Sequence, residues 1–157
     1  MKPTLYILCG VPGCGKSFYA ENFRHDGVTI SRDQIRFGLL NDGEDYFSKE
    51  DQVFNRFITM IHGNLKRGIP VMADATHLNA ISRRKLIKGI DRCGFIEYNI
   101  VFIYFNTPFE VCCGRNNKRD GLKRVPQDVM DSMYKNFQKP SMMEDKRCIG
   151  LWLMKGE

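Results

Sequence analysis

Short runs of apolar residues alternate along the chain with longer stretches in which apolar residues recur every three or four positions. Short runs of this kind, rich in Ile, Val and Phe, are typical of strands buried on both faces of a sheet. They occupy residues 5–9, 28–30, 69–73, 98–105 and 149–154. We therefore expect five strands.

The stretches between these runs have the spacing of amphipathic helices, as when Val53, Phe57 and Ile61 return to one face. Thr107 and Pro108 are suited to be the N-cap and first residue of a later helix. The expected helices cover residues 16–23, 48–67 and 80–93, with two more following Pro108 and Pro126. Strands separated by helices indicate an α/β fold with a mainly parallel sheet and right-handed crossovers.

The length of 157 residues suits one domain with its own core, so we expect a single domain over residues 1–157. No apolar run approaches the ~18–20 residues that cross a bilayer. The apolar stretch from Leu5 leads directly into a glycine-rich motif, which a cleavable signal peptide would destroy. These features predict a cytoplasmic protein that is not embedded in a membrane.

The formal net charge of +6 is concentrated in two segments. Residues 115–124 and 83–92 each contain five bases and one acid, whereas residues 41–51 contain five acids and one base. Clustered bases suit a polyanionic partner such as nucleic acid. For residues 83–92, a solvated helix face explains the bases equally well.

The glycine-rich motif is GVPGCGKS at residues 10–17, a full match to the phosphate-binding pattern GxxxxGK[ST] between a strand and a helix. Such a loop points its amides at a polyphosphate, and the helix dipole favours the same charge. Lys16 is expected at the β and γ oxygens and Ser17 at Mg²⁺. The pattern predicts binding of a nucleoside triphosphate and Mg²⁺ by Gly10, Gly13, Cys14, Gly15, Lys16 and Ser17, and no base-reading residue decides between ATP and GTP.

Polar residues also follow the second and third predicted strands, and in a parallel sheet all such residues face one crevice. Asp33 is placed to orient an acceptor hydroxyl and take its proton, and Arg36 on the same helical face could hold an acceptor phosphate. The alternative for Asp33 is a helix N-cap, for which Ser31 also qualifies.

Asp74 ends the third strand in the manner of a Walker B acid that supports Mg²⁺, or else it hydrogen-bonds the next loop. Thr76 in that loop is a candidate for contact with the acceptor. His77 is more typical of a hydrogen-bonding loop residue than of a base. The basic segment 115–124 suits a mobile lid in which Arg115 and Arg119 contact the nucleotide, with Gly121 as hinge; a solvated helix end is the alternative.

In the order of these motifs the chain resembles the 5′-polynucleotide kinases of the bacteriophage type over nearly its whole length. The P-loop is shared by many kinases, and the second and last of the matching pieces together are far more specific. These pieces are GVPGCGKS at 10–17, SRDQIR at 31–36, DATHLN followed by RR at 74–84, and RNNKRDGLKRVPQDVMDSMYKNF at 115–137.

The resemblance implies a P-loop kinase fold and transfer of the γ-phosphoryl group of ATP to the 5′-hydroxyl end of DNA or RNA. It implies that Asp33 is the general base, that Arg36 contacts the acceptor's phosphate and that Arg119 stabilises the transition state. Family members usually have Asn where this chain has His77. The DxDGT motif of the downstream 3′-phosphatase domain does not occur here, which implies a protein with kinase activity only.

Two other functions fit the same motifs. A small-molecule or nucleoside kinase shares the P-loop and the lid arginine, and a non-catalytic module would bind nucleotide to regulate a partner. Poor phosphorylation of free nucleosides would favour a polynucleotide acceptor, and tight ATP binding without any phosphorylated acceptor would favour the module. The residue types alone leave open the choice between DNA and RNA.

Overall fold

The computed structural model describes residues 1–23 and 26–155. Five strands form one sheet in the order β2-β3-β1-β4-β5, and all four neighbouring pairs are parallel. The strands are β1 (Thr4–Cys9), β2 (Val28–Ser31), β3 (Val71–Asp74), β4 (Asn99–Phe105) and β5 (Cys148–Met154). This sheet confirms the predicted α/β class and P-loop kinase fold.

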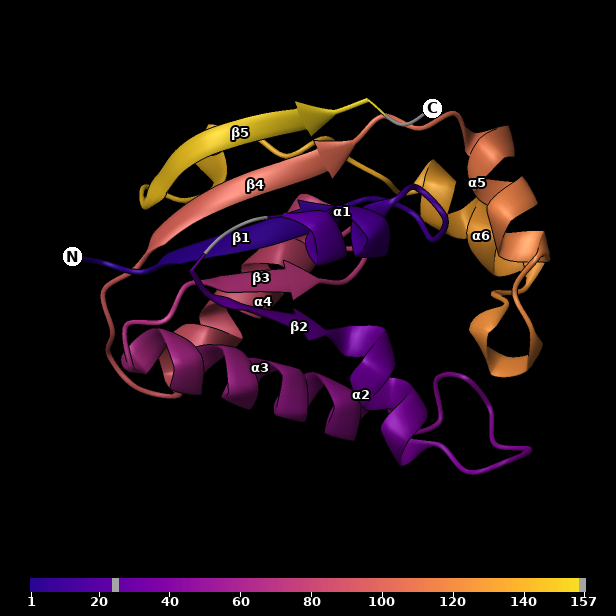
Figure 1. The fold of residues 1–157 in the computed structure, drawn as a ribbon, viewed down its shortest axis with the longest axis horizontal. Coiled ribbons are helices and arrows are strands. Elements are labelled where there is room, and N and C mark those ends of the chain that lie inside the picture. Colours follow the sequence, from indigo (N-terminus) through magenta and orange to yellow (C-terminus); the bar gives the residue numbers. More distant parts are fainter. Residues whose placement is uncertain (24–25, 156–157) are drawn as a thin grey trace.

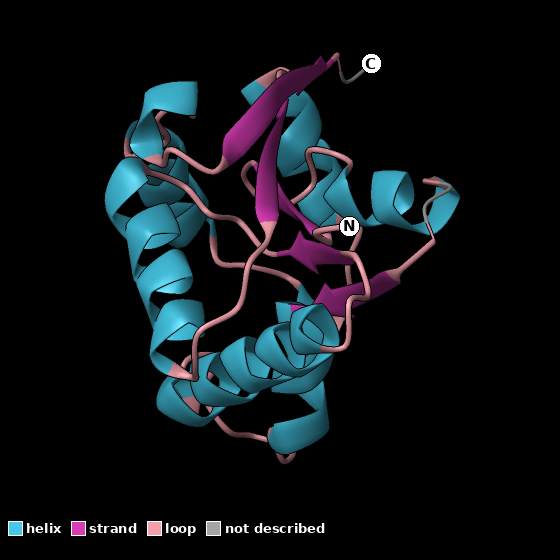
Figure 2. Ribbon diagram, turned by 90° about the vertical axis from the view of Figure 1, so that its left-hand side faces the viewer, coloured by secondary structure: helices cyan, strands magenta, loops and turns pink. Residues whose placement is uncertain are grey.

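In the part of the chain that the structure describes, six α-helices connect or flank these strands. They are α1 (Lys16–Asn22), α2 (Arg32–Leu39), α3 (Glu50–Lys66), α4 (Ala80–Arg92), α5 (Phe109–Asn117) and α6 (Gln127–Lys135). Figure 1 shows α2, α5 and α6 beyond the arrowheads of the strands, and Figure 2 shows helices on both sides of the sheet. The carboxyl ends of the strands therefore face a space that these three helices border.

One face of the sheet packs against α3 and α4. Phe57 and Ile61 from α3 and Leu86 and Ile90 from α4 are fully or almost fully buried against strand residues such as Phe102. Burying a side chain of this size contributes about 1.5–3 kcal/mol, so this face anchors the fold. The other face packs against α1, α5 and α6 through a second buried cluster.

The parallel registers align the ends of the strands. Leu5 of β1 pairs with Val71 of β3, Ile7 pairs with Phe102 of β4, and Ser31 of β2 pairs with Asp74 of β3. The segments that follow these strands consequently emerge at one edge, as the sequence predicted. None of the helices in residues 1–23 and 26–155 has the length and apolarity needed to cross a bilayer.

Candidate active site

The phosphate loop has a backbone that only glycine accommodates easily. Gly13 and Gly15 have φ angles of +83° and +108°, in the region that favours glycine. A Cβ atom on Gly13 would also lie 2.5 Å from the carbonyl oxygen of Cys112, and one on Gly10 would lie 2.4 Å from Sγ of Cys14. The three glycines of the motif are therefore required by the local conformation and packing.

Contacts from three other segments hold this loop. The amide of Gly10 donates to the carbonyl oxygen of Thr76 at 2.9 Å, and Arg115 Nη1 donates to that of Gly13 at 3.0 Å. The hydroxyl of Thr107 donates to the carbonyl oxygen of Cys14 at 2.7 Å. The prediction that Thr107 caps the following helix is wrong, because Pro108 is the N-cap and the threonine hydroxyl is committed to the loop.

Lys16 folds back over the loop. Its ammonium nitrogen lies 2.8 Å from the carbonyl oxygen of Gly10 and 3.0 Å from that of Val11. The amides of Gly13 and Gly15 donate to no acceptor among the described residues, so they are free to bind an anion. The loop therefore offers one cation and unpaired N–H donors, which is the donor set that a polyphosphate requires.

Ser17 and Asp74 form the oxygen-rich part of the site. The Ser17 hydroxyl lies 3.1 Å from Oδ2 of Asp74, a carboxylate that is 7% exposed. Burial raises the pKa of Asp74 above its ordinary value, while the nearby charge of Lys16 opposes this shift. Hydroxyl and carboxylate oxygens are ligands that Mg²⁺ prefers. No cluster of three or more His, Cys, Asp or Glu side chains suited to a metal occurs in the described residues, so phosphate oxygens and water would complete the coordination.

Asp33 lies in the first turn of α2. Its side chain is 51% exposed and borders a cavity that is also lined by Lys16 and Asp74. The N-cap of α2 is Ser31, whose hydroxyl accepts the amide of Gln34 at 3.2 Å. The alternative in which Asp33 caps the helix is therefore wrong, and its carboxylate is available for another role.

Arg36 is only 4% exposed and is bound within the protein. Its Nη2 lies 2.6 and 2.8 Å from the two carboxylate oxygens of Glu50, and its Nη1 pairs with Oδ1 of Asp33. Arg36 Nε also donates to Oε1 of Glu50 at 3.3 Å, and this bidentate pairing fixes the guanidinium in place. Arg36 does not border the cavity, so its assignment to an acceptor phosphate stays a prediction.

Tyr46 is a member of this network that the sequence analysis missed. Its ring lies 4.4 Å from the guanidinium carbon of Arg36, and its hydroxyl lies 3.0 Å from Nη1 of Arg36. Burial and the negative charge of Asp33 raise the pKa of Tyr46 above its ordinary value, so the phenol is protonated. It occurs in an acidic, aperiodic segment, and no spacing rule pointed to it.

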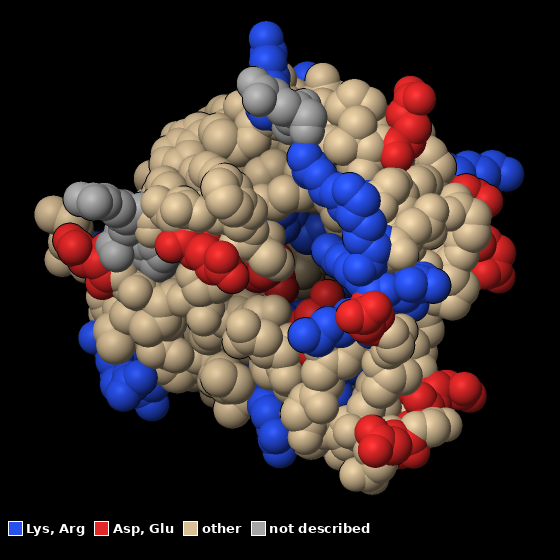
Figure 3. Space-filling view, turned by 45° about the vertical axis from the view of Figure 1, so that its right-hand side comes forward, with Lys and Arg blue, Asp and Glu red and all other residues tan. Residues whose placement is uncertain are grey.

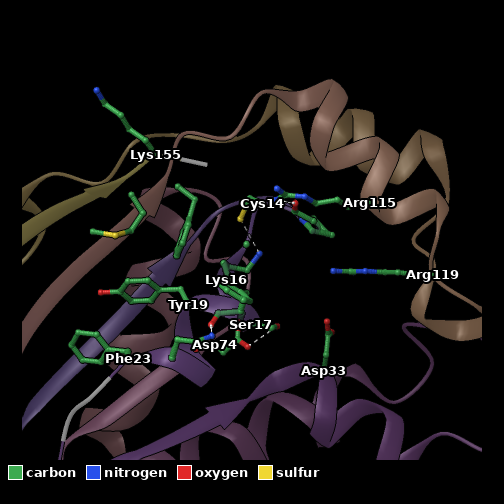
Figure 4. Close-up of a pocket in the computed structure, with 18 residues that line it drawn as sticks. Cys14, Lys16, Ser17, Tyr19, Phe23, Asp33, Asp74, Arg115, Arg119 and Lys155 are labelled. Atoms are coloured by element: carbon green, nitrogen blue, oxygen red, sulfur yellow. Dashed lines mark hydrogen bonds between the residues drawn. The ribbon is translucent and has the colours of Figure 1, made fainter. Parts of the chain in front are cut away.

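The segment predicted to be a lid, residues 115–124, comprises the end of α5 and the short 3₁₀ turn Gly121–Lys123 that precedes α6. Figure 3 shows a line of basic side chains beside a hollow in which acidic atoms are visible. In Figure 4, Arg119 reaches into the cavity from α5's side while Asp33 points toward it from α2. Both lid residues named from the sequence, Arg115 and Arg119, border this cavity.

The cavity has a volume of about 840 Å³. Its polar part holds most of the predicted site residues, and Tyr19, Phe23, Phe105 and Met154 form an apolar part. The predicted residues that border it are Gly13, Cys14, Gly15, Lys16, Ser17, Asp33, Asp74, Arg115 and Arg119. Gly10, Thr76 and Arg36 lie outside the wall, although Gly10 and Thr76 contact each other and support the loop.

His77 is a structural residue of the loop after β3. It is 4% exposed, has a φ of +40°, and its Nδ1 lies 2.6 Å from the carbonyl oxygen of Leu8. Its Nε2 has no hydrogen-bond partner within the described part of the chain. Burial lowers the pKa of His77 to about 3, which keeps the ring neutral. His77 is therefore not placed to act as a base in the cavity.

Arg83 does not contribute to a basic surface. It is 1% exposed, and its guanidinium binds Glu144 at 2.8 Å and the carbonyl oxygen of His77 at 2.7 Å. The two explanations offered for the bases of residues 83–92, contact with a polyanion and a solvated helix face, are thus both wrong for this arginine. It joins the loop after β3 to the segment before β5.

Comparison with known proteins places this chain in a wider group. The sequence model of a family described as "AAA domain" matches residues 5–140. A chain of the Pnkp1/Rnl/Hen1 RNA repair complex is 24% identical with a TM-score of 0.70, and the match covers 85% of this chain and 43% of that one.

Two kinases with other acceptors have the same fold. A sugar kinase from Janibacter sp. HTCC2649 is 16% identical with a TM-score of 0.65, over 99% of this chain and 86% of that one. The Mycobacterium tuberculosis APS kinase CysC, in complex with AMPPNP and APS, is 18% identical with a TM-score of 0.62, over 97% and 88%. These likenesses show a shared P-loop kinase fold.

Proposed function

Because the chain belongs to the family described as an AAA domain, here with a P-loop kinase fold, we propose that it is an ATP-dependent polynucleotide 5′-hydroxyl kinase. The observation that carries this proposal is the arrangement in Figure 4. An exposed carboxylate, Asp33, faces the P-loop residues Lys16 and Ser17 and the lid residue Arg119 across one cavity. This is the set of groups that in-line phosphoryl transfer to a hydroxyl requires.

In the proposed reaction, Asp33 accepts the proton of the acceptor's 5′-hydroxyl. The hydroxyl oxygen bonds to the γ-phosphorus of ATP as the bond between that phosphorus and the β–γ bridging oxygen breaks, which releases ADP. Lys16 and Arg119 neutralise the negative charge on the transferring group. The loop amides of Gly13 and Gly15 hold the phosphates in line with the acceptor.

Ser17 and Asp74 are the residues that would hold Mg²⁺, with phosphate oxygens as further ligands. When bound, the ion neutralises charge on the β and γ oxygens. The closeness of Lys16 to this pair lets one set of residues position both the metal and the phosphates. Gly10 and Thr76 act through the backbone, because their hydrogen bond sets the base of the loop.

Two features support a polynucleotide as the acceptor. The segments SRDQIR and RNNKRDGLKRVPQDVMDSMYKNF resemble pieces of the bacteriophage-type kinases, and a chain of an RNA repair complex has this fold. This chain spans less than half of that one, so the activities of the larger protein are not transferred as a whole. Repair of nucleic-acid ends is the role that fits such a kinase.

One observation favours a small-molecule kinase instead. Arg36, the residue proposed to bind an acceptor phosphate, is buried and paired with Glu50. The sugar kinase and the APS kinase also match over most of their own lengths. Under this second candidate the acceptor would be a small molecule with a free hydroxyl, and the other groups would keep their roles.

The deciding experiment measures transfer of label from γ-labelled ATP with Mg²⁺ to a 5′-hydroxyl oligonucleotide, a matched 5′-phosphorylated oligonucleotide, nucleosides, sugars and APS. We expect label only on the 5′-hydroxyl oligonucleotide. Label on a small molecule alone would establish the second candidate. Nucleotide binding without any labelled acceptor would overturn both.

A further inference from the structure

The exposed face of α4 carries cations that the proposed chemistry does not use. Lys85, Lys88 and Arg92 recur at helical spacing and are all exposed, and we call them the α4 row. Exposed Ile81 shares this face, opposite the side that packs on the sheet. None of the three cations forms a salt bridge within residues 1–23 and 26–155.

The row begins close to the candidate active site. Two cations lie against the ring of Phe54 in α3. Lys85 Nζ is 4.8 Å from the ring centroid, and Arg32 Cζ is 5.1 Å from it. Arg32 directly precedes Asp33 at the start of α2. Arg32 and the ring of Phe54 thus connect the proposed general base, Asp33, to Lys85, the first residue of the row.

The row then follows a continuous seam between α3 and α4. A Cβ atom on Gly89 would lie 2.3 Å from Cδ1 of Ile58, and His62 Nε2 lies 3.2 Å from the carbonyl oxygen of Gly94. The two helices therefore pack closely from the site to the far end of α4. Phe95, just past that end, is 89% exposed.

Acidic groups near the row are mostly neutralised by the protein itself. Asp91 on the same helix is bound by Arg147 through two contacts of 3.0 Å. Glu50 is bound by Arg36 and Arg32. Asp51 remains exposed at the start of α3. The α4 row itself, Lys85, Lys88 and Arg92, consequently carries a net positive charge that suits a polyanion.

We propose that the α4 row is the track of the acceptor strand, a single-stranded polynucleotide whose 5′ end lies at Asp33. Its phosphates on the 3′ side lie over Arg32, Lys85 and Lys88. The eight residues from Lys85 to Arg92 span about 10 Å of helix, enough for roughly three phosphates of a strand whose bases are stacked. This inference rests on the proposed function and specifies how that site distinguishes a strand from a small acceptor.

The test compares Lys85→Gln/Lys88→Gln with a control that removes the same charge elsewhere, Arg56→Gln/Lys146→Gln, where both residues are exposed. The acceptors are a 5′-hydroxyl dinucleotide and a 5′-hydroxyl 16-mer. We expect the track variant to raise the KM for the 16-mer about tenfold and to leave the dinucleotide within about twofold. The slope of log KM against log salt should fall by about 1.4 for the 16-mer, because two contacts are lost.

Each other outcome counts against the proposal. Equal KM values in the track and control variants would overturn the track while the kinase activity stands. Equal losses for dinucleotide and 16-mer would overturn it as well, since the effect would then lie at the reacting end. If the wild-type protein labels neither acceptor, the proposed function fails, and the track fails with it. Circular dichroism and a melting curve confirm that each variant is folded.

Discussion

The hydroxyl of Tyr46 lies 2.9 Å from Oδ1 of Asp33, and it donates a hydrogen bond to this carboxylate. Arg36 contacts the same oxygen, so Oδ1 has two donors from within the protein. The second oxygen, Oδ2, is then the one that can face an acceptor hydroxyl. Tyr46 and Arg36 together define how the proposed base is oriented.

Tyr46→Phe removes this donor and keeps the ring against Arg36. We expect kcat to fall about tenfold with the KM for ATP unchanged, because a hydrogen bond to a charged group contributes about 1.5–3 kcal/mol. Steady-state kinetics with the 5′-hydroxyl oligonucleotide measures the effect. The control is Tyr134→Phe, at a half-exposed phenol on α6. A wild-type kcat in Tyr46→Phe would show that Arg36 alone orients Asp33.

Asp33→Asn retains the size of the side chain and removes the proton acceptor. We expect the single-turnover rate to fall at least about 100-fold, which is the lower range for loss of a general base. Calorimetric titration should find ATP affinity within about twofold of wild type, because Asp33 is across the cavity from the loop. Joint loss of transfer and ATP binding would show that the residue is structural.

Arg119→Ala tests the lid. We expect kcat to fall roughly 10³-fold, since an arginine that stabilises the transferring group is worth at least that much in related chemistry. Lys118→Ala is the matched control, because Lys118 is an exposed neighbour that does not border the cavity. Similar activities of the two variants would mean that the lid contributes only general positive charge.

His77 provides a prediction about pH and stability. Burial lowers its pKa to about 3 from 6.5, with the nearby cations Arg32, Lys16 and Arg83 adding to the effect. Below pH 6.5 the imidazole of residue 77 is therefore protonated in the unfolded chain but stays neutral in the folded chain. The contribution of His77 to the free energy of unfolding is fully present above pH 6.5 and is lost as the pH falls. The slope is about 1.4 kcal/mol per pH unit, or about 2 kcal/mol by pH 5.

Urea unfolding of the wild type and of His77→Asn between pH 7.5 and 5 measures this pH-dependent contribution to the free energy of unfolding. Asn tolerates a positive φ and can donate to the carbonyl oxygen of Leu8, yet it does not titrate. We expect the variant's unfolding free energy to depend less on pH by the amount given above. Parallel curves for the two proteins would mean that the ring becomes protonated in the folded state.

The parts of the site that could be predicted from sequence are those set by short spacing. GVPGCGKS defines its own loop, and Asp33 and Asp74 are located by the ends of strands. The roles of Arg36 and Tyr46 could not be predicted in this way. The partner of Arg36 is Glu50, which is 14 residues away, and Tyr46 lies in the irregular segment between α2 and α3. The fold followed from apolar periodicity, which the sheet confirms.

Arg83 shows where the available signal was misread. Its position on α4 has the same phase as Leu86, Ile87 and Ile90, so helical spacing already assigned it to the buried face. Treating residues 83–92 as one charged segment ignored that phase. Thr107 was misassigned for a different reason, since its partner Cys14 is 93 residues away in the chain.

The contact of Arg83 with Glu144 also limits how this protein can vary. Arg83 holds the carbonyl oxygen of His77, whose ring holds Leu8 at the base of the phosphate loop. Losing Glu144 alone would leave a buried cation unpaired, at a cost of about 3–5 kcal/mol. Substitutions at positions 83 and 144 should therefore be inherited as a pair, because either one alone removes a large share of the about 5–15 kcal/mol by which a domain is stable.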